Sequence, residues 1–172
     1  LIASGDIIVN YKEYVITSEK INYNRSKSQL IFDRNVTISD QKGNRILSSQ
    51  FDFNLKNESG IIHNGRIETV KQYFIEAETI SVDKGVVSLH KAVLTTCSLD
   101  HPHYYLASNK LGVNRKSGTV SASSNKLMFY GIPVFYFPTY SQEASGSNKN
   151  RVAPKFGRNL IDGVYGNVNA GY

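Results

Sequence analysis

The sequence predicts an all-β protein made of stacked repeats. β-branched and aromatic residues dominate its apolar set, with eleven Tyr and eight Phe but one Met among 172 residues, and such residues favour strands. Apolar and polar residues alternate at period two, most clearly over residues 7–11, 35–39 and 51–55, and no stretch of about ten residues has helical periodicity. A short sequence motif, which we call the phrase, also recurs, and its copies begin at residues 18, 48, 77 and 108. A repeat of this length is typical of supersecondary units that stack on one another.

Each copy of the phrase has a small residue, two polar positions, two apolar residues separated by one spacer, and a final Asn or Asp. The copies are Ser18–Asn24, Ser48–Asn54, Ala77–Asp83 and Ser108–Asn114. Residues two apart in a strand share a face, so the apolar pairs are expected on one face. The pairs are Ile21 with Tyr23, Phe51 with Phe53, Ile80 with Val82, and Leu111 with Val113. That face is either ordinary core between two sheets or part of an open groove for acyl chains.

A polar turn and a second apolar stretch follow each phrase, so each unit is predicted to be strand, turn, strand. Gly, Asn and Ser in these turns supply positive φ and local hydrogen bonds. Turns are expected at residues 12–13, 24–28, 40–44, 57–60, 84–85 and 115–118, within an array that covers residues 5–130. Short strands at such even spacing suit a sandwich, a jelly roll or a β-solenoid.

The pattern changes in four places after residue 94. Thr95–His103 is a polar loop with the single Cys, and Gly131–Tyr140 is an aromatic segment that contains two prolines. Residues 141–150 are rich in Ser, Asn and Gly and are expected to form a loop. Residues 162–172 alternate loosely and are rich in Gly, as membrane barrel strands often are. The chain ends in mid-alternation, so we expect it to be part of a longer protein.

No catalytic motif is present, so the chain is not predicted to be an enzyme or to need a cofactor. It has no Gly-rich phosphate loop, nucleophile elbow or His-Glu-x-x-His. Cys97, His101 and His103 have ligand types that suit zinc, but no fourth ligand is evident and a plain loop is the expectation. The dispersed acids argue against a polysaccharide-cleaving enzyme, which needs clustered carboxylates.

The net charge of +6 favours either an anionic partner or simply well-solvated turns. The Lys and Arg residues are distributed one or two per turn, with no basic stripe interleaved with aromatics. Nucleic acid is therefore not predicted as a partner.

Three segments together resemble the LptD family of outer-membrane lipopolysaccharide assembly proteins. They are Leu94–Cys97, Ser108–Asn114 and Gly131–Pro138. The repeats from Gly5 to Asp83 also look like the OstA-type repeats that LptD shares with the periplasmic bridge protein LptA. The resemblance covers about residues 5–140. It implies a periplasmic β-jelly roll, open along one side, over residues 1–132, then a linker and the first strands of an outer-membrane β-barrel over 133–172.

This resemblance implies a role in lipopolysaccharide transport without a catalytic step. The jelly roll would accept lipopolysaccharide from an LptA-like bridge and shield its acyl chains before lateral release through the barrel. The implied partners are lipopolysaccharide, that bridge, an LptE-like lipoprotein plug and the outer membrane of a Gram-negative bacterium. Two alternatives stay open: a stand-alone LptA-like bridge protein, and a β-helical polysaccharide-active protein or adhesin.

The resemblance also assigns roles to particular residues. The apolar groove would be lined by Ile21, Tyr23, Phe32, Phe51, Phe53, Ile80, Val82, Leu111 and Val113. The edge strand that accepts a neighbouring jelly roll would be residues 5–11, with Ile7, Val9 and Tyr11. Cys97 matches the cysteine that pairs with one near the end of the barrel.

The prolines and the basic residues near the end of the chain are assigned by the same resemblance. Pro133 and Pro138 match the linker, and Pro154 matches a proline that weakens strand pairing at the gate. A second gate proline is replaced by Ala144. Basic residues near the gate are candidates for contact with lipid phosphates: Lys149, Arg151, Lys155 and Arg158.

Overall fold

The computed structural model describes residues 1–114, 116–143, 152–159 and 163–170, with side chains described up to residue 141. All twelve elements in these ranges are strands, which confirms the predicted all-β class. Within the same ranges, no helix could cross a membrane.

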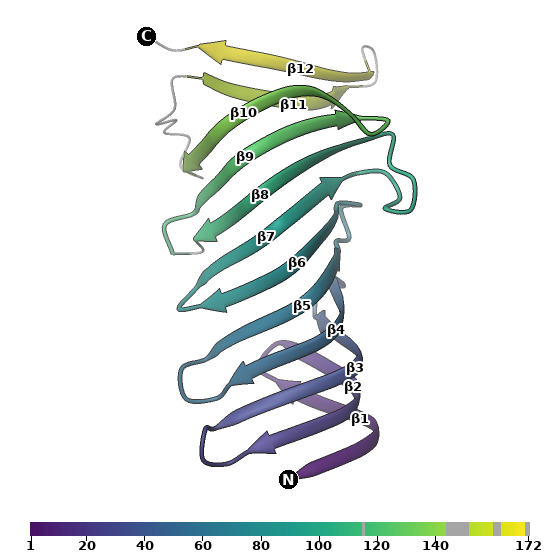
Figure 1. The fold of residues 1–172 in the computed structure, drawn as a ribbon, viewed down its shortest axis with the longest axis vertical. Helices are drawn as coiled ribbons and strands as arrows, with labels where there is room; N and C mark the ends of the chain where they lie inside the picture. The colour runs from purple at the N-terminus through teal and green to yellow at the C-terminus, as the bar shows by residue number, and fades with distance from the viewer. Residues whose placement is uncertain (115, 144–151, 160–162, 171–172) are drawn as a thin grey trace.

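Ten strands form one antiparallel sheet in which each strand pairs with the next along the chain (Figure 1). Their bounds are β1 Ile2–Tyr11, β2 Tyr14–Asn24, β3 Gln29–Asp40, β4 Arg45–Asn54, β5 Ser59–Glu68, β6 Phe74–Asp83, β7 Val86–Thr95, β8 Tyr104–Asn114, β9 Thr119–Phe129 and β10 Ile132–Glu143. The sheet is open, with β1 and β10 as its edges. A separate two-stranded sheet consists of β11 Val152–Asn159 and β12 Gly163–Ala170.

The long strands bend near their middle, where pairing is interrupted. The register shifts between Thr17 and Lys20 in β2 and between Asp33 and Val36 in β3. Non-glycine residues with positive φ occupy the same region of the odd strands: Arg34, Asn35, Asn64, Lys91 and Ser124. An unpaired extra residue bends a strand and increases its twist. The sheet therefore folds over, so that the two halves of one face lie opposite each other, and Figure 1 shows the first strands curving round one side of the molecule.

Small residues line the inside of this bend. The first residue of each repeated phrase lies there, and Ser18, Ala77 and Ser108 are buried. Their partners on odd strands include Ala92, opposite Ser108, and Gly65, opposite Ala77. Small side chains let the two halves approach closely, so the recurring small residue specifies the bend.

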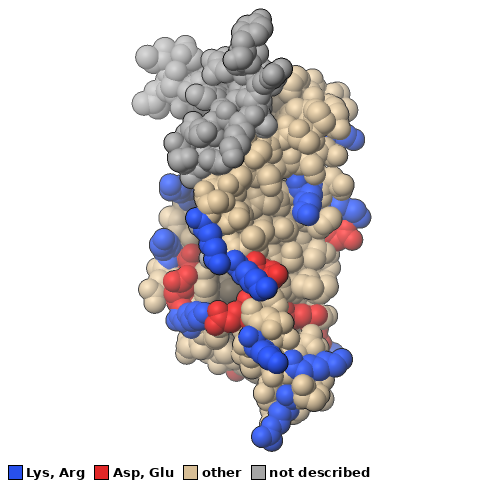
Figure 2. Space-filling model, turned by 90° about the vertical axis from the view of Figure 1, so that its left-hand side faces the viewer, with Lys and Arg blue, Asp and Glu red and all other residues tan. Residues whose placement is uncertain are grey.

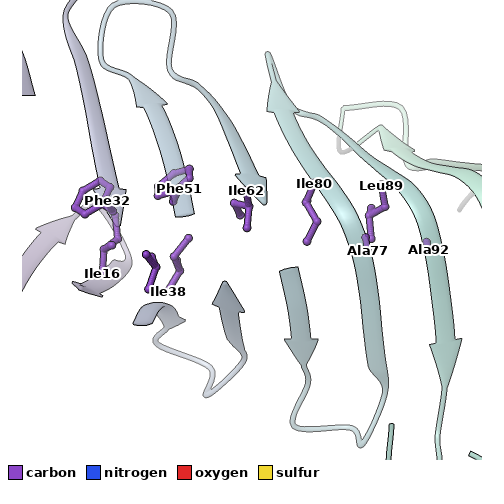
Figure 3. Packing of buried hydrophobic residues seen from close by; sticks show 10 residues of the cluster. Ile16, Phe32, Ile38, Phe51, Ile62, Ala77, Ile80, Leu89 and Ala92 are labelled. Carbon is purple, nitrogen blue, oxygen red and sulfur yellow. The ribbon is translucent and has the colours of Figure 1, made fainter. Parts of the chain in front are cut away.

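Two apolar ladders cross the sheet, one in each half. Cross-strand partners share a face. One half of the sheet contains the first part of each even-numbered strand, up to its bend, and the ladder in this half is Val9, Ile16, Ile38, Ile46, Ile67, Ile75, Leu94, Leu106, Leu127 and Phe135. In the other half they are Ile21, Phe32, Phe51, Ile62, Ile80, Leu89, Leu111 and Ala122. Members of both ladders meet in one buried cluster, and in Figure 3 Phe32 and Ile16 point into the same space.

The structure confirms most of the predicted turns. Strands end and begin around residues 12–13, 25–28, 41–44, 84–85 and 116–118, and the polar break from residue 96 to 103 is the loop between β7 and β8. The turn expected at 57–60 lies instead at residues 55–58, because Ser59 and Gly60 already belong to β5. The Asn that ends a phrase stabilises its turn: Asn54 Oδ1 accepts hydrogen bonds from the backbone N–H groups of Lys56 and Asn57, at 2.9 and 3.1 Å. The turn over residues 69–73, between β5 and β6, was not predicted.

Strand β10 crosses the expected domain boundary at residue 132. It contains Pro133 and Pro138 and pairs with β9 from Ile132 to Glu143, so both prolines lie in the edge strand of the large sheet. Edge strands and bulges tolerate proline, and the register shifts between Pro133 and Phe135. The division into two domains, and the assignment of residues 133–172 to a barrel, stay predictions.

Candidate functional site

The space between the two halves of the folded sheet, which we call the slot, is the main candidate site. It contains a cavity of about 350 Å³ near the β1–β2 turn. The cavity is lined mainly by apolar side chains of both ladders, and its rim is polar. Its lining includes Tyr11, Tyr14, Ile16, Ile38, Ile46, Phe51, Phe53, Ile62 and Val82, with Lys12, Glu13 and Glu58 also among its residues. Figure 2 shows a recess on this side of the molecule, flanked by basic and acidic side chains.

An aromatic row leads from the core to this cavity. Phe32 is fully buried and stacks on Phe51, with ring centroids 5.6 Å apart. Phe51 contacts Phe53 at 5.6 Å, and Phe53 meets the edge of Tyr11 at 5.1 Å. Gly60 makes room for this row, because a Cβ built on it would lie 2.7 Å from the Phe51 ring. The row therefore joins the two halves of the sheet beside the cavity.

An ion pair bridges the two sides of the cavity rim. Lys12 Nζ, in the β1–β2 turn, donates to Glu58 Oε2, in the β4–β5 turn, at 2.9 Å, and the Tyr11 hydroxyl donates to Glu58 Oε1 at 3.3 Å. The hydrogen bond between them raises the pKa of Lys12 above its ordinary 10.5 and lowers the pKa of Glu58 below its ordinary 4.5. Both side chains are more than half exposed, so water and salt screen the pair and it adds little to the stability of the fold.

The predicted groove residues all belong to the inner face of the sheet, but they differ in burial. Phe32, Phe51 and Ile80 are buried within the core between the halves. The others are partly exposed: Ile21, Tyr23, Phe53, Val82, Leu111 and Val113. Contact of any of them with a lipid stays a prediction.

Sequence reasoning missed the ladder in the other half of the sheet. A signal for it was present, because an apolar residue stands two positions before the small residue of every phrase: Ile16, Ile46, Ile75 and Leu106. Each of these residues lies on the same face of its strand as the small residue that follows it, and the strand bends at that small residue. Since the bend was not predicted, a second apolar wall was not expected.

The slot is more open near β10 than near β3. Phe32 is 0% exposed, and Ile16 and Ile38 are buried on the opposite wall. In the last strands the equivalent ladder positions are less covered, and Phe135 is 43% exposed. Nearby large apolar residues are also exposed: Phe129, Tyr130, Ile132, Val134 and Tyr136. The slot thus runs from a closed core to an apolar end.

The predicted partner edge is β1, which pairs on one side only, with β2. Val9 and Tyr11 pack against the core cluster, and Ile7 is half-buried. The side chain of Ile8, between them, is 66% exposed. The strand therefore has one apolar inner face and one outward row of backbone donors and acceptors.

The loop between β7 and β8 shows no metal site. Cys97 is half-buried and unbonded to another cysteine, and its backbone N–H donates to Thr95 Oγ1 at 3.1 Å. His103 instead contacts the Tyr130 ring. Among the residues that the structure describes, no three potential metal ligands gather. Since Cys97 is the single cysteine, a disulfide within this chain is ruled out, and a bond to a cysteine outside it stays a prediction.

The gate residues lie partly outside the described region. Pro154 is in β11, opposite Val168 of β12. Lys155 and Arg158 are in the same strand, but their side chains are not among those described. Ala144, Lys149 and Arg151 lie outside the described residues, so their proposed roles stay predictions.

A second, shallower depression of about 740 Å³ lies on the outer side of the bend. It is lined mostly by polar residues, including Arg34, Asn35 and Asn64. Several of these polar side chains form hydrogen bonds with one another: Asn35 donates to Glu19, and Asn64 donates to Ser49 Oγ at 3.4 Å. This surface is wide and open, and we assign no function to it.

The chain is similar in sequence to LPS-assembly proteins LptD from several bacteria. It is 22% identical over 152 residues to the protein of Neisseria meningitidis serogroup A, matching 86% of this chain. It is 25% identical over 158 residues to that of Neisseria gonorrhoeae, again over 86% of the chain. For Nitrosospira multiformis the identity is 26% over 154 residues, or 87% of the chain.

These matches cover only a small part of each relative. The chain spans 19% of the two Neisseria proteins and 16% of the Nitrosospira protein. No family model matches the chain. The similarity runs through most of this chain and agrees with its all-β fold, so the chain resembles one part of the longer LptD proteins.

Proposed function

We propose that this domain takes part in lipopolysaccharide assembly by holding the acyl chains of lipopolysaccharide in the slot. Two facing apolar ladders that continue from strand to strand carry this proposal. A lipid chain along the ladders would replace water at each step, and each buried CH₂ is worth about 0.8 kcal/mol. The slot needs no catalytic group for this role.

The occupied part of the slot is the partly exposed lining rather than its buried residues. Phe32, Phe51 and Ile80 are buried in the core between the halves, so displacing them would disrupt the core. Phe53 and Val82 line the existing cavity. They are therefore the first candidates for contact with acyl chains, and Leu111 and Val113 extend the same wall toward β10.

The free edge of β1 is the proposed entry point for an LptA-like bridge. An incoming strand would pair with the outward backbone groups of residues 5–11 by β-augmentation. A shared sheet would place the bridge's apolar face next to Val9 and Tyr11, so the acyl chains would pass between two continuous slots. The lipid would then be released through an outer-membrane barrel, which the longer protein would form and an LptE-like lipoprotein would plug. Residues 1–132 would lie in the periplasm.

A charge placed in the slot tests this function. Phe53→Asp should weaken binding of purified lipopolysaccharide at least about tenfold, because a carboxylate in an apolar site is strongly disfavoured. Val15→Asp is the matched control, since Val15 lies on the outer face of β2 and is 41% exposed. Binding would be measured by fluorescence displacement, and circular dichroism would show that both variants keep their β-structure. Equal binding by Phe53→Asp and the unaltered chain would refute acyl-chain binding in the slot.

A further inference from the structure

Among the described turns, those along one side of the slot carry most of the cations that have no acidic partner. We call these turns, between β2 and β3, β4 and β5, β6 and β7, and β8 and β9, the basic lip. Their described cations are Arg25, Lys27, Lys56, Lys84 and Lys116, against the single acid Glu58. All five cations are exposed, and none forms an ion pair within the described residues.

The turns on the other side of the slot are nearly balanced in charge. They contain Lys12, Lys42 and Lys71 against Glu13 and Asp100. Lys12 is paired with Glu58, and Lys42 lies beside Asp40, whose pKa is lowered by its hydrogen bonds with Asn44 and by Lys42. Among the described turns, most of the excess positive charge therefore lies in the basic lip. General solubility of turns would have distributed cations equally on both sides.

The basic lip follows the apolar wall strand by strand. Each of its turns comes directly after an apolar pair of the repeated phrase, as Lys56 follows Phe53 and Lys84 follows Val82. Successive turns on one side are separated by two strands, or about 9.5 Å. Lys116 reaches toward the neighbouring turn, because a Cβ built on Gly85 would lie 3.7 Å from its Cε. The cations therefore form a row that runs parallel to the slot.

A row of free cations beside an apolar slot matches an amphiphile with an anionic headgroup. Lysine binds phosphate as a point charge from a flexible stem, so it can follow a headgroup that moves along the row. We propose that the basic lip binds the phosphate groups of a lipid whose acyl chains occupy the slot, and so orients that lipid with its headgroup toward the turns. This inference rests on the proposed function, and it adds the headgroup site and the direction in which the lipid lies.

Matched variants test the basic lip. Lys56→Gln, Lys84→Gln and Lys116→Gln combined remove three lip cations. Lys71→Gln, Lys110→Gln and Lys126→Gln combined remove three other exposed cations. Both sets change the net charge equally and lie on the surface. The probes are diphosphorylated lipid A and the same lipid with its phosphates removed, each tested at low and high salt.

The lip variant should bind diphosphorylated lipid A about 10- to 100-fold more weakly, because each exposed lysine near an anionic lipid surface contributes about a factor of five. Its binding of the dephosphorylated lipid should not change, and the control variant should bind both lipids as the unaltered chain does. High salt should reduce the difference between the two lipids. Inorganic phosphate alone should show no saturable binding at comparable concentration, since it has no apolar anchor.

The results separate this inference from the proposed function. Equal binding of both lipids by the unaltered chain, or an unchanged affinity of the lip variant, would overturn the basic lip while acyl-chain binding stands. An equal loss in both variant sets would also overturn it, since net charge alone would then explain the effect. If the unaltered chain bound neither lipid, the proposed function would fail, and the headgroup site with it.

Discussion

Ile61 and Ile62 are adjacent in β5, but their side chains lie on opposite faces of the sheet. Ile62 is 3% exposed and belongs to the ladder between Phe51 and Ile80, whereas Ile61 is 43% exposed on the outer face. The inner face is therefore a packed wall at this strand, and the outer face faces solvent. Comparing the effect of truncating each of these two neighbours therefore measures how much the core between the halves contributes to stability.

Ile62→Ala should lower the free energy of unfolding by about 2–5 kcal/mol, because it leaves a cavity in a buried cluster. Ile61→Ala should cost less than about 1 kcal/mol, mainly through its lower strand propensity. Urea denaturation followed by circular dichroism measures both. Similar costs for the two substitutions would mean that the two halves of the sheet do not pack against each other.

Lys12 and Glu58 make a second prediction at the scale of residues, which depends on pH. Because the pKa of Glu58 is lowered from 4.5, its contribution to stability is complete above that value and is lost as the pH falls through the folded-state pKa. Because the pKa of Lys12 is raised from 10.5, its contribution is complete below that value and is lost as the pH rises through the folded-state pKa. The ion pair across the cavity rim is therefore intact at neutral pH.

NMR titration of the Glu58 carboxyl should give a midpoint below 4.5, and Lys12→Met should move it back toward 4.5. Glu78 provides a control in the same spectrum, since its pKa is lowered by Lys91 and not by Lys12. An unchanged Glu58 midpoint in Lys12→Met would contradict the ion pair.

At the scale of elements, the bend in each strand converts one sheet into two facing walls. The sequence was sufficient to predict the strands and most turns, because alternation and turn residues are local signals. It was not sufficient to predict the bend. A small residue such as Ser48 or Ala77 indicates a bend only when it is known that the other half of the sheet packs closely against it. For the same reason the apolar pairs could be assigned to one face, but not divided between core and groove.

The bend is built differently in the last strands. Asn125 is fully buried there, where earlier strands have Val36, Gly65 and Ala92. Its Oδ1 accepts from Ser108 Oγ at 2.6 Å, and its Nδ2 donates to the Phe137 carbonyl at 3.2 Å. This side chain thus links β8, β9 and β10 at the bend.

Asn125→Ala should lower the free energy of unfolding by about 1–3 kcal/mol, since it leaves the buried Ser108 hydroxyl and the Phe137 carbonyl without this partner. Hydrogen exchange should accelerate most in β10, which pairs only with β9 in the large sheet. Ser123→Ala, in the same strand, should have little effect on β10. Exchange that is faster by the same factor in all ten strands would contradict a local link.

At the scale of the whole molecule, the slot combines a closed core near β3 with a more open apolar end near β10. One edge of the sheet, β1, is free for pairing, and the other, β10, is rich in exposed aromatic residues. A lipid that enters at β1 and leaves past β10 would follow the partly exposed residues of the inner face, from Phe53 and Val82 to Leu111 and Val113. The account therefore depends on acyl chains contacting the inner face.

Site-specific photo-crosslinking to lipopolysaccharide tests this most directly. A photoreactive residue would replace Phe53 or Val82 on the inner face, and Asp52 or Ser81, their neighbours on the outer face, in turn. The account predicts crosslinks from Phe53 and Val82 and none from Asp52 and Ser81. Crosslinks of equal yield from both faces, or from the outer face alone, would contradict it.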